Sequence, residues 1–230
     1  MSIARKLTKA SVLMAGVLFF GFVVLAIDDG GPVETREVPA PILEAIHISH
    51  GLAANIVQGD PTTMKLTGRT RDIDRVLISF EGTDVTLHRD GNLWTMAQGL
   101  VDLLLGRDQS VTIDIALPAL THLEASMGAS ASAKQLANEA LTISADTGAN
   151  IMLAGRADSL RLNAQNGANI VASDLLTQRT EAEASTGANV LVNARQSIRA
   201  RSATGASIVV DGAPVERDVD NGSGANIVIK

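Results

Sequence analysis

Apolar and polar residues alternate with a period of two in the second half of the chain, and the alternating runs recur at a nearly constant interval. Each run begins at a glycine that is followed by Ala, then by Ser or Asn, then by an aliphatic or small residue. Intervals of 20, 19, 20, 18 and 19 residues separate the glycines at the start of these runs, Gly128, Gly148, Gly167, Gly187, Gly205 and Gly224. A period of two is typical of a strand with one buried face.

This repeat predicts an all-β fold, a parallel β-solenoid with coils of about 19 residues. One such coil cannot bury its apolar side alone, whereas stacked coils pair each strand with the coils above and below. The runs before and after each glycine both alternate, so each coil is expected to contain at least two strands. The glycine between them marks a tight corner that requires a positive φ or a close approach of the backbone.

The polar columns of the repeat support the same register. Six residues before successive glycines, the charge alternates through Arg161, Glu181, Arg199 and Asp218. A second column contains Glu183, Arg201 and Asp220. Opposite charges on neighbouring strands are favourable, although each exposed pair contributes only about 0–1 kcal/mol.

The first half of the chain has shorter strand-like runs and one segment of helical spacing. The runs cover residues 46–48, 54–57, 76–80 and 85–87, separated by Gly, Asp and Thr clusters. Residues 93–105 carry apolar side chains at helical intervals between Asn92 and Gly106, so we expect a short helix or apolar flap there. Two roles remain open for it: closing one end of the sheet core, or binding a partner.

The N-terminus has the pattern of a targeting segment. Three basic residues, Arg5, Lys6 and Lys9, precede an apolar run over residues 10–27, and Ala26 provides a small residue for cleavage. Residues 1–27 are therefore expected to be a cleaved signal peptide or a retained helical membrane anchor. Residues 28–41 have a turn-rich composition that predicts a linker, and residues 42–230 are assigned to the solenoid domain, with regular repeats over 109–230.

Composition narrows the classes of function. The chain has no Cys, which excludes disulfides and thiolate metal sites. Residues 28–230 contain 16 basic against 25 acidic residues, a net charge of −9, which disfavours nucleic acid and anionic lipid as partners. Aromatic residues make up 2% of the chain, so the core must be thin and built from small aliphatic residues.

Taken together, several stretches resemble a known bacterial family, the "putative auto-transporter adhesin, head GIN domain". They are Ala45–Ile48, Ala54–Val57, Val111–Pro118 leading into Leu120 and Leu123, Ser126–Ser130, and the Gly-Ala-Asn repeats, together covering roughly residues 42–230. The resemblance implies an exported right-handed β-helix linked to adhesion. It implies no catalytic residues.

Two columns beside the corner are candidate sites. The first contains Asn150, Asn169, Asn189 and Asn226, which could offer amides to a glycan but which we interpret mainly as a structural ladder. The second lies two residues further along, on the outward face, and contains Met152, Val171, Leu191, Val209 and Val228. An aliphatic stripe on the outside of a solenoid indicates a protein contact or cover by another part of the same chain.

Other candidate chemistry is weak. Residues 218–222 resemble a calcium loop, but the glycine comes one position early and the twelfth position is Ile229 where the loop requires Glu, so a charged turn is the expected structure. His47 and His50 lie three apart, which puts them on opposite faces of a strand. We therefore expect no metal site, no cofactor and no enzymatic activity.

The sequence thus predicts a non-enzymatic binding or adhesion module of the periplasm or cell envelope. The expected partner is an envelope or cell-surface protein or a glycan, and the membrane is expected to be contacted only through residues 10–27 if these are retained. The alternative is a structural element that self-associates as a homo-oligomer, through the aliphatic stripe or through the short last coil, residues 224–230. A carbohydrate-active enzyme is the least favoured class.

Overall fold

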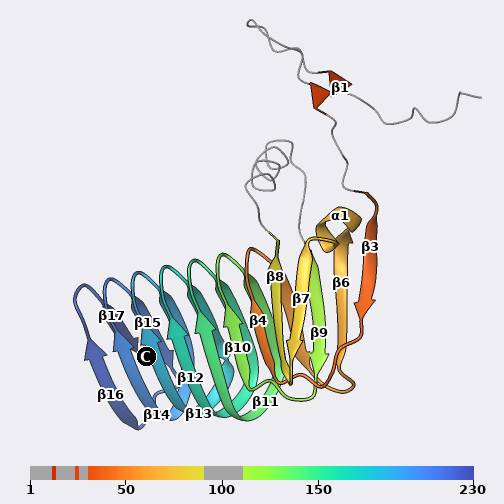
Figure 1. Cartoon of the computed structure of the whole chain (residues 1–230). Coiled ribbons are helices and arrows are strands. Elements are labelled where there is room, and N and C mark those ends of the chain that lie inside the picture. Colours follow the sequence, from red (N-terminus) through yellow and green to blue (C-terminus); the bar gives the residue numbers. More distant parts are fainter. Residues whose placement is uncertain (1–11, 14–23, 26–30, 91–110) are drawn as a thin grey trace, which may run out of the picture.

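A computed structural model of the chain describes residues 12–13, 24–25, 31–90 and 111–230. The predicted β-solenoid is confirmed: parallel strands stack coil upon coil through most of the domain to its C-terminal end, and antiparallel strands extend it at the N-terminal end (Figure 1). Two sheets enclose the core. They share four long strands, β11 to β14, whose first parts belong to one sheet and whose second parts belong to the other.

The first sheet contains the strands that directly follow the glycine corners. In spatial order it holds β3 (Val33–Val38), β6 (Thr63–Arg69), β9 (Thr112–Leu117), β5 (Ala53–Gln58), the first parts of β11 (Ser130–Ala145), β12 (Asn150–Ala164), β13 (Asn169–Ala184) and β14 (Asn189–Ser202), then β15 (Ser207–Asp211) and β17 (Asn226–Ile229).

The second sheet contains the strands that lead into the corners. In spatial order it holds β7 (Val76–Glu81), β8 (Asp84–Arg89), β4 (Ala45–Ile48), β10 (His122–Ala125), the second parts of β11 to β14, and β16 (Glu216–Asn221). A single helical turn, α1 (Thr70–Ile73), follows β6. The two-residue strands β1 (Val12–Leu13) and β2 (Val24–Leu25) pair with each other only.

The register between coils is the one that the repeat predicts. Asn150 lies opposite Ser130 and Asn169, and the same column continues through Asn189, Ser207 and Asn226. The inward columns form the core. In the first sheet, Ile151, Ile170, Val190 and Ile208 have no exposed surface; in the second sheet the same is true of Ile143, Leu162, Ala182 and Ala200. The core is thus built from aliphatic residues of small to medium size, Ala, Val, Ile and Leu, as a thin interior without aromatic rings requires.

A positive φ, and not a lack of space, explains the corner glycines. The six glycines have φ between 67° and 74°, and a Cβ added at any of the first five meets no other atom within 4 Å. The preceding residue also has a positive φ in five corners, for example Thr147 at 48° and Asn166 at 50°. The corners stack through backbone bonds, because the N–H of Gly148 donates to the carbonyl of Asn166 at 3.1 Å and the other coils repeat this bond.

The N-terminal end of the domain differs from the sequence-based expectation. Residues 28–41, expected to be a linker, include strand β3, which pairs antiparallel with β6. Neither β6 nor α1 was predicted. Polar side chains on both faces of β3 hide the strand pattern, since β3 is an exposed edge strand held by pairs such as Thr35–Thr67.

Two expected helices lie outside the described residues. The helix or flap over residues 93–105 falls in the gap at 91–110. The signal peptide or anchor over 1–27 falls in the N-terminal gaps, apart from the four residues of β1 and β2. Within the described parts of the chain, no helix is long and apolar enough to cross a membrane.

Candidate functional site

The outward column next to the corner forms a ladder of amides along the first sheet. The Nδ2 of Asn169 donates to Oδ1 of Asn150 at 3.1 Å, and the Nδ2 of Asn189 donates to Oδ1 of Asn169 at 3.1 Å. The Nδ2 of Asn150 donates to the carbonyl of Gly148 at 3.3 Å. These amides therefore hydrogen-bond to one another and to the corner backbone, which leaves fewer donors for an outside ligand.

The aliphatic stripe, defined as Met152, Val171, Leu191, Val209 and Val228, lies beside this ladder on the outer side of the first sheet. Each member pairs in register with the next, so the five side chains form a continuous row. Met152 is 57% exposed and Val228 39% exposed, and the three between them are half-buried by their neighbours in the row. No described part of the chain covers Met152.

A shallow hollow of about 280 Å³ marks the start of the stripe. Its floor and walls combine the stripe with the amide column, and include Asn55, Ser132, Asn150, Met152, Asn169 and Val171. An apolar strip with polar groups along one side has the composition of a protein contact, in which an apolar centre is surrounded by a polar rim.

The outer side of the second sheet carries the charge ladders. Arg161 donates to Glu181 at 2.7 Å, and Arg199 donates to Asp218 at 2.9 Å while lying 4.0 Å from Glu181. Residues 218–222, expected to form a charged turn, instead lie mostly in strand β16, which pairs parallel with the second part of β14 and places Asp218 opposite Arg199. The ladder is a structural feature that ties successive coils together.

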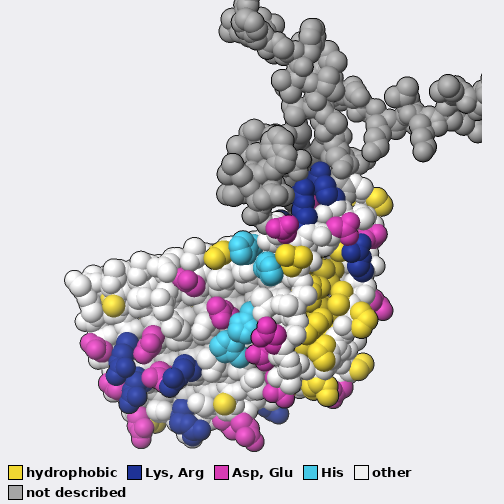
Figure 2. Space-filling model, in the orientation of Figure 1, with side chains coloured by type: hydrophobic (Ala, Val, Ile, Leu, Met, Phe, Trp, Pro, Cys, Tyr) yellow, Lys and Arg dark blue, Asp and Glu magenta, His cyan; other side chains and the backbone are white. Residues whose placement is uncertain are grey.

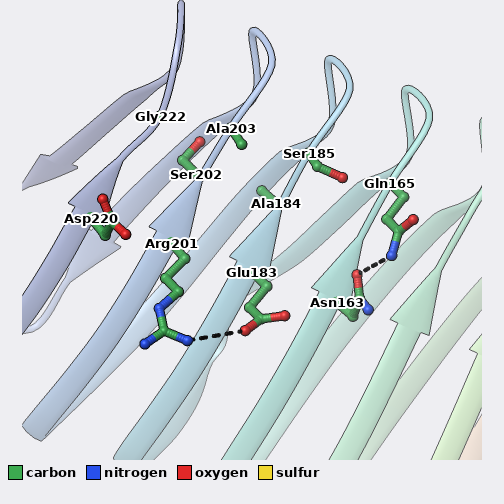
Figure 3. Close-up of a pocket in the computed structure, with 10 residues that line it drawn as sticks. All are labelled: Asn163, Gln165, Glu183, Ala184, Ser185, Arg201, Ser202, Ala203, Asp220 and Gly222. Carbon is green, nitrogen blue, oxygen red and sulfur yellow. Dashed lines mark hydrogen bonds and ion pairs between the residues drawn. The ribbon is translucent and has the colours of Figure 1, made fainter.

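A hollow of about 320 Å³ lies on the same face beside the corners (Figure 3). Arg201 stands between the strands that carry Glu183 and Asp220, and its guanidinium is 3.7 Å from Glu183. Close by, Gln165 donates to Asn163 at 3.0 Å. General acid–base catalysis on a glycoside needs two carboxylates that face a substrate. A cation placed between the carboxylates favours a structural role for this hollow.

Histidines from distant segments meet on the second sheet, which the sequence did not predict. His47 on β4 and His122 on β10 have ring centroids 5.3 Å apart, and Nδ1 of His47 is 3.1 Å from Oε2 of Glu124. His50, at a corner, lies 6.3 Å from His88. Figure 2 shows these histidines in two groups on one face, with acidic side chains beside the lower group. Sequence reasoning did not find this cluster because it depends on the pairing of β4 with β10. These two strands are more than 70 residues apart in the sequence.

Resolved pKa shifts lie at the N-terminal end of the domain. Lys65 hydrogen-bonds to Glu37 at 2.8 Å, which lowers the pKa of Glu37 and raises the pKa of Lys65. Burial lowers the pKa of Arg89, against the opposing effect of Asp72. The Glu37–Lys65 pair ties β3 to β6, and none of these groups belongs to the stripe or to the cluster of His47, His122 and Glu124.

Comparison with known proteins gives a family and a fold. The family described as "Putative auto-transporter adhesin, head GIN domain" matches residues 43–214. A crystal structure of a putative adhesin from Bacteroides fragilis is similar, with 15% identity and a TM-score of 0.65, covering 86% of this chain and 97% of that one. A putative adhesin from Parabacteroides merdae has 14% identity and a TM-score of 0.50, with the same coverage of 86% and 97%.

A third structure, a putative lipid binding protein from Parabacteroides distasonis, has 17% identity and a TM-score of 0.47, covering 88% of this chain and 99% of that one. A TM-score at that level supports no conclusion about this chain. A search of the curated proteins finds no match. The solved structures therefore support the fold, and the family match places the chain among adhesin-like proteins.

Proposed function

Because the chain belongs to the family described as "putative auto-transporter adhesin, head GIN domain", we propose that it is an exported, non-enzymatic binding module of the cell envelope. Its partner is an envelope or cell-surface protein, which it contacts through the aliphatic stripe. The solenoid serves as a rigid support, because every strand of the contact sheet except the edge strands β3 and β17 is paired on both sides.

The main support for this proposal is that the outward column containing the stripe changes from polar to aliphatic residues along the solenoid. In the coils nearer the N-terminus, the same column is filled by Asp114, Asn55 and Ser132, which pair in register and lead directly to Met152. The fold therefore accepts polar residues at this position. From Met152 onward the column is aliphatic. These residues expose apolar surface to solvent, which is unfavourable and is not needed to form the fold.

The chemistry of the stripe favours a protein over a glycan. Glycan sites commonly use aromatic faces and free polar groups, whereas the stripe is purely aliphatic and the adjoining amides bond to one another. Neighbouring strands are about 4.8 Å apart, so five residues extend over about 19 Å. That length fits the apolar core of an interface, with the amide column supplying part of the rim.

Export is part of the proposal. Basic residues followed by the apolar run over residues 10–27 support passage through a membrane, with that run either cleaved or kept as an anchor. The net charge of −9 beyond residue 27 opposes contact with anionic lipid and is compatible with an envelope protein as partner.

A binding assay with matched variants tests the proposal. Purified full chain is titrated onto envelopes of the producing bacterium, using wild type, Met152→Asp and Leu191→Asp. Burying a Leu or Met side chain is worth about 1.5–3 kcal/mol, so each variant should bind about 10- to 100-fold more weakly. Leu176→Asp is the control, because Leu176 is 46% exposed but lies outside the stripe.

Treatment of the envelopes identifies the partner class. Protease treatment should abolish binding, and periodate oxidation of glycans should leave it unchanged. Binding that survives protease but not periodate would replace the protein partner with a glycan. Light scattering that shows oligomers dissociated by Leu191→Asp would instead support a self-associating structural element.

A further inference from the structure

We propose that His47, His122 and Glu124 form a surface site for a divalent transition-metal ion. The site lies on the outer side of the second sheet, away from the aliphatic stripe on the first sheet. It is independent of the proposed binding function, and its success or failure leaves that proposal untouched.

The strand pairing brings the three side chains together. His122 and Glu124 are two residues apart on β10 and so point to the same face, while Glu124 pairs in register with His47 on β4. Oε2 of Glu124 is 3.1 Å from Nδ1 of His47 and 4.0 Å from Nε2 of His122. One ligand atom from each of the three residues lies within 4.8 Å of the other two.

The backbone beneath the site is fixed. The alternate residues Ile46, Ile48, Leu123 and Ala125 point inward and are at most 1% exposed. Zinc takes nitrogen and oxygen ligands at about 2.0–2.2 Å, which places tetrahedral ligands about 3.3 Å from one another. The separations range from 3.1 Å to at most 4.8 Å, so side-chain rotations that shorten the longer ones bring all three atoms to one ion without moving the strands.

The ligand set selects the class of metal. Two imidazoles with one carboxylate suit Zn²⁺, Ni²⁺ or Cu²⁺, whereas Ca²⁺ and Mg²⁺ require sites made mainly of oxygen. Three protein ligands leave at least one coordination position open. His47 is 32% exposed and Glu124 46% exposed, so that position faces solvent and accepts water or a donor atom from another molecule.

The competing explanation is an ordinary surface ion pair between histidine and glutamate. Isothermal titration of the full chain, purified without a polyhistidine tag, distinguishes the two. Zn²⁺ should bind with a stoichiometry that falls by one ion per chain in His47→Gln and His122→Gln, with affinity at this site reduced at least about 100-fold. Glu124→Gln should reduce the affinity about 10- to 100-fold.

Two controls keep the test specific. His88→Gln, which changes the other histidine pair, should leave the affinity of the site unchanged, and Ca²⁺ or Mg²⁺ should not compete. Circular dichroism shows whether each variant keeps the fold. Bound Co²⁺ provides a second measurement, because its visible absorption reports nitrogen ligation and should be lost in His122→Gln. Zn²⁺ binding that is absent in the wild type, or equal in wild type and His122→Gln, would overturn the proposal.

Discussion

Two glycines on the stacked coils should respond very differently to the same substitution, since the structure assigns them different constraints. Gly187 sits at a corner with φ of 72° and has no atom within 4 Å of an added Cβ. Gly155 lies on β12 with φ of 133°, and an added Cβ falls close to the backbone of Leu136 on the adjoining coil. Substituting Ala at Gly187 therefore measures the free-energy cost of a positive φ alone. The same substitution at Gly155 measures that cost together with the cost of a steric clash between coils.

The magnitudes follow from these surroundings. At Gly187, Ala adopts a left-handed conformation at a cost of about 1–2 kcal/mol, partly offset by about 0.4–1 kcal/mol from the stiffer unfolded chain. The net loss should be about 1 kcal/mol. At Gly155, a strained φ combines with an overpacked contact between coils, each costing about 1–3 kcal/mol. The loss there should reach about 3 kcal/mol or more.

Thermal unfolding followed by circular dichroism measures the difference. For a domain of this size, 1 kcal/mol corresponds to about 2–4 °C in Tm. Gly187→Ala should lower Tm by about 3 °C and Gly155→Ala by about 9 °C. Equal losses for the two variants would refute the distinction between a corner that needs only a positive φ and a coil contact that excludes a side chain.

Two further predictions concern charge. Glu181→Lys places three cations in a row with Arg161 and Arg199, so it should lower stability by about 1 kcal/mol at low salt and by less at 1 M salt, which Tm at both ionic strengths would show. Lys65 lowers the pKa of Glu37 below the ordinary value of 4.5, so this pair stabilises β3 fully above pH 4.5 and loses its effect as pH falls through the lowered pKa. Hydrogen exchange of β3 amides, corrected for intrinsic rates, should rise in that acid range in wild type and stay flat in Glu37→Gln.

The solenoid and its register could be predicted because each coil repeats the same constraints. Glycine at the corner, Ala after it and alternating aliphatic residues place every strand against its neighbour, and the alternating charges through Arg161 and Glu181 agree with that placement. The stripe could also be located, because it is a column of the same repeat. Its exposure could not be read from the sequence, since cover by other strands was equally compatible with the pattern.

In the N-terminal part, the runs predicted over residues 46–48, 54–57, 76–80 and 85–87 correspond to β4, β5, β7 and β8, but β3 and β6 could not be predicted. Strands β3 and β6 are antiparallel additions at the end of the first sheet, and their sequences belong to no repeat. The histidine cluster required the same kind of information. His47 and His122 become neighbours only when β4 pairs with β10, and no local spacing indicates that pairing.

Contact through the aliphatic stripe can be tested most directly by cysteine labelling, because the chain has no cysteine of its own. Single cysteines are placed at Met152 and Leu191 in the stripe, and at Leu176 and Arg161 outside it. Maleimide labelling rates are then compared for the free chain and for the chain bound to envelopes. We predict that binding slows labelling at the two stripe positions at least about 10-fold and leaves the other two unchanged. Equal labelling of the stripe in the free and bound states would contradict the account.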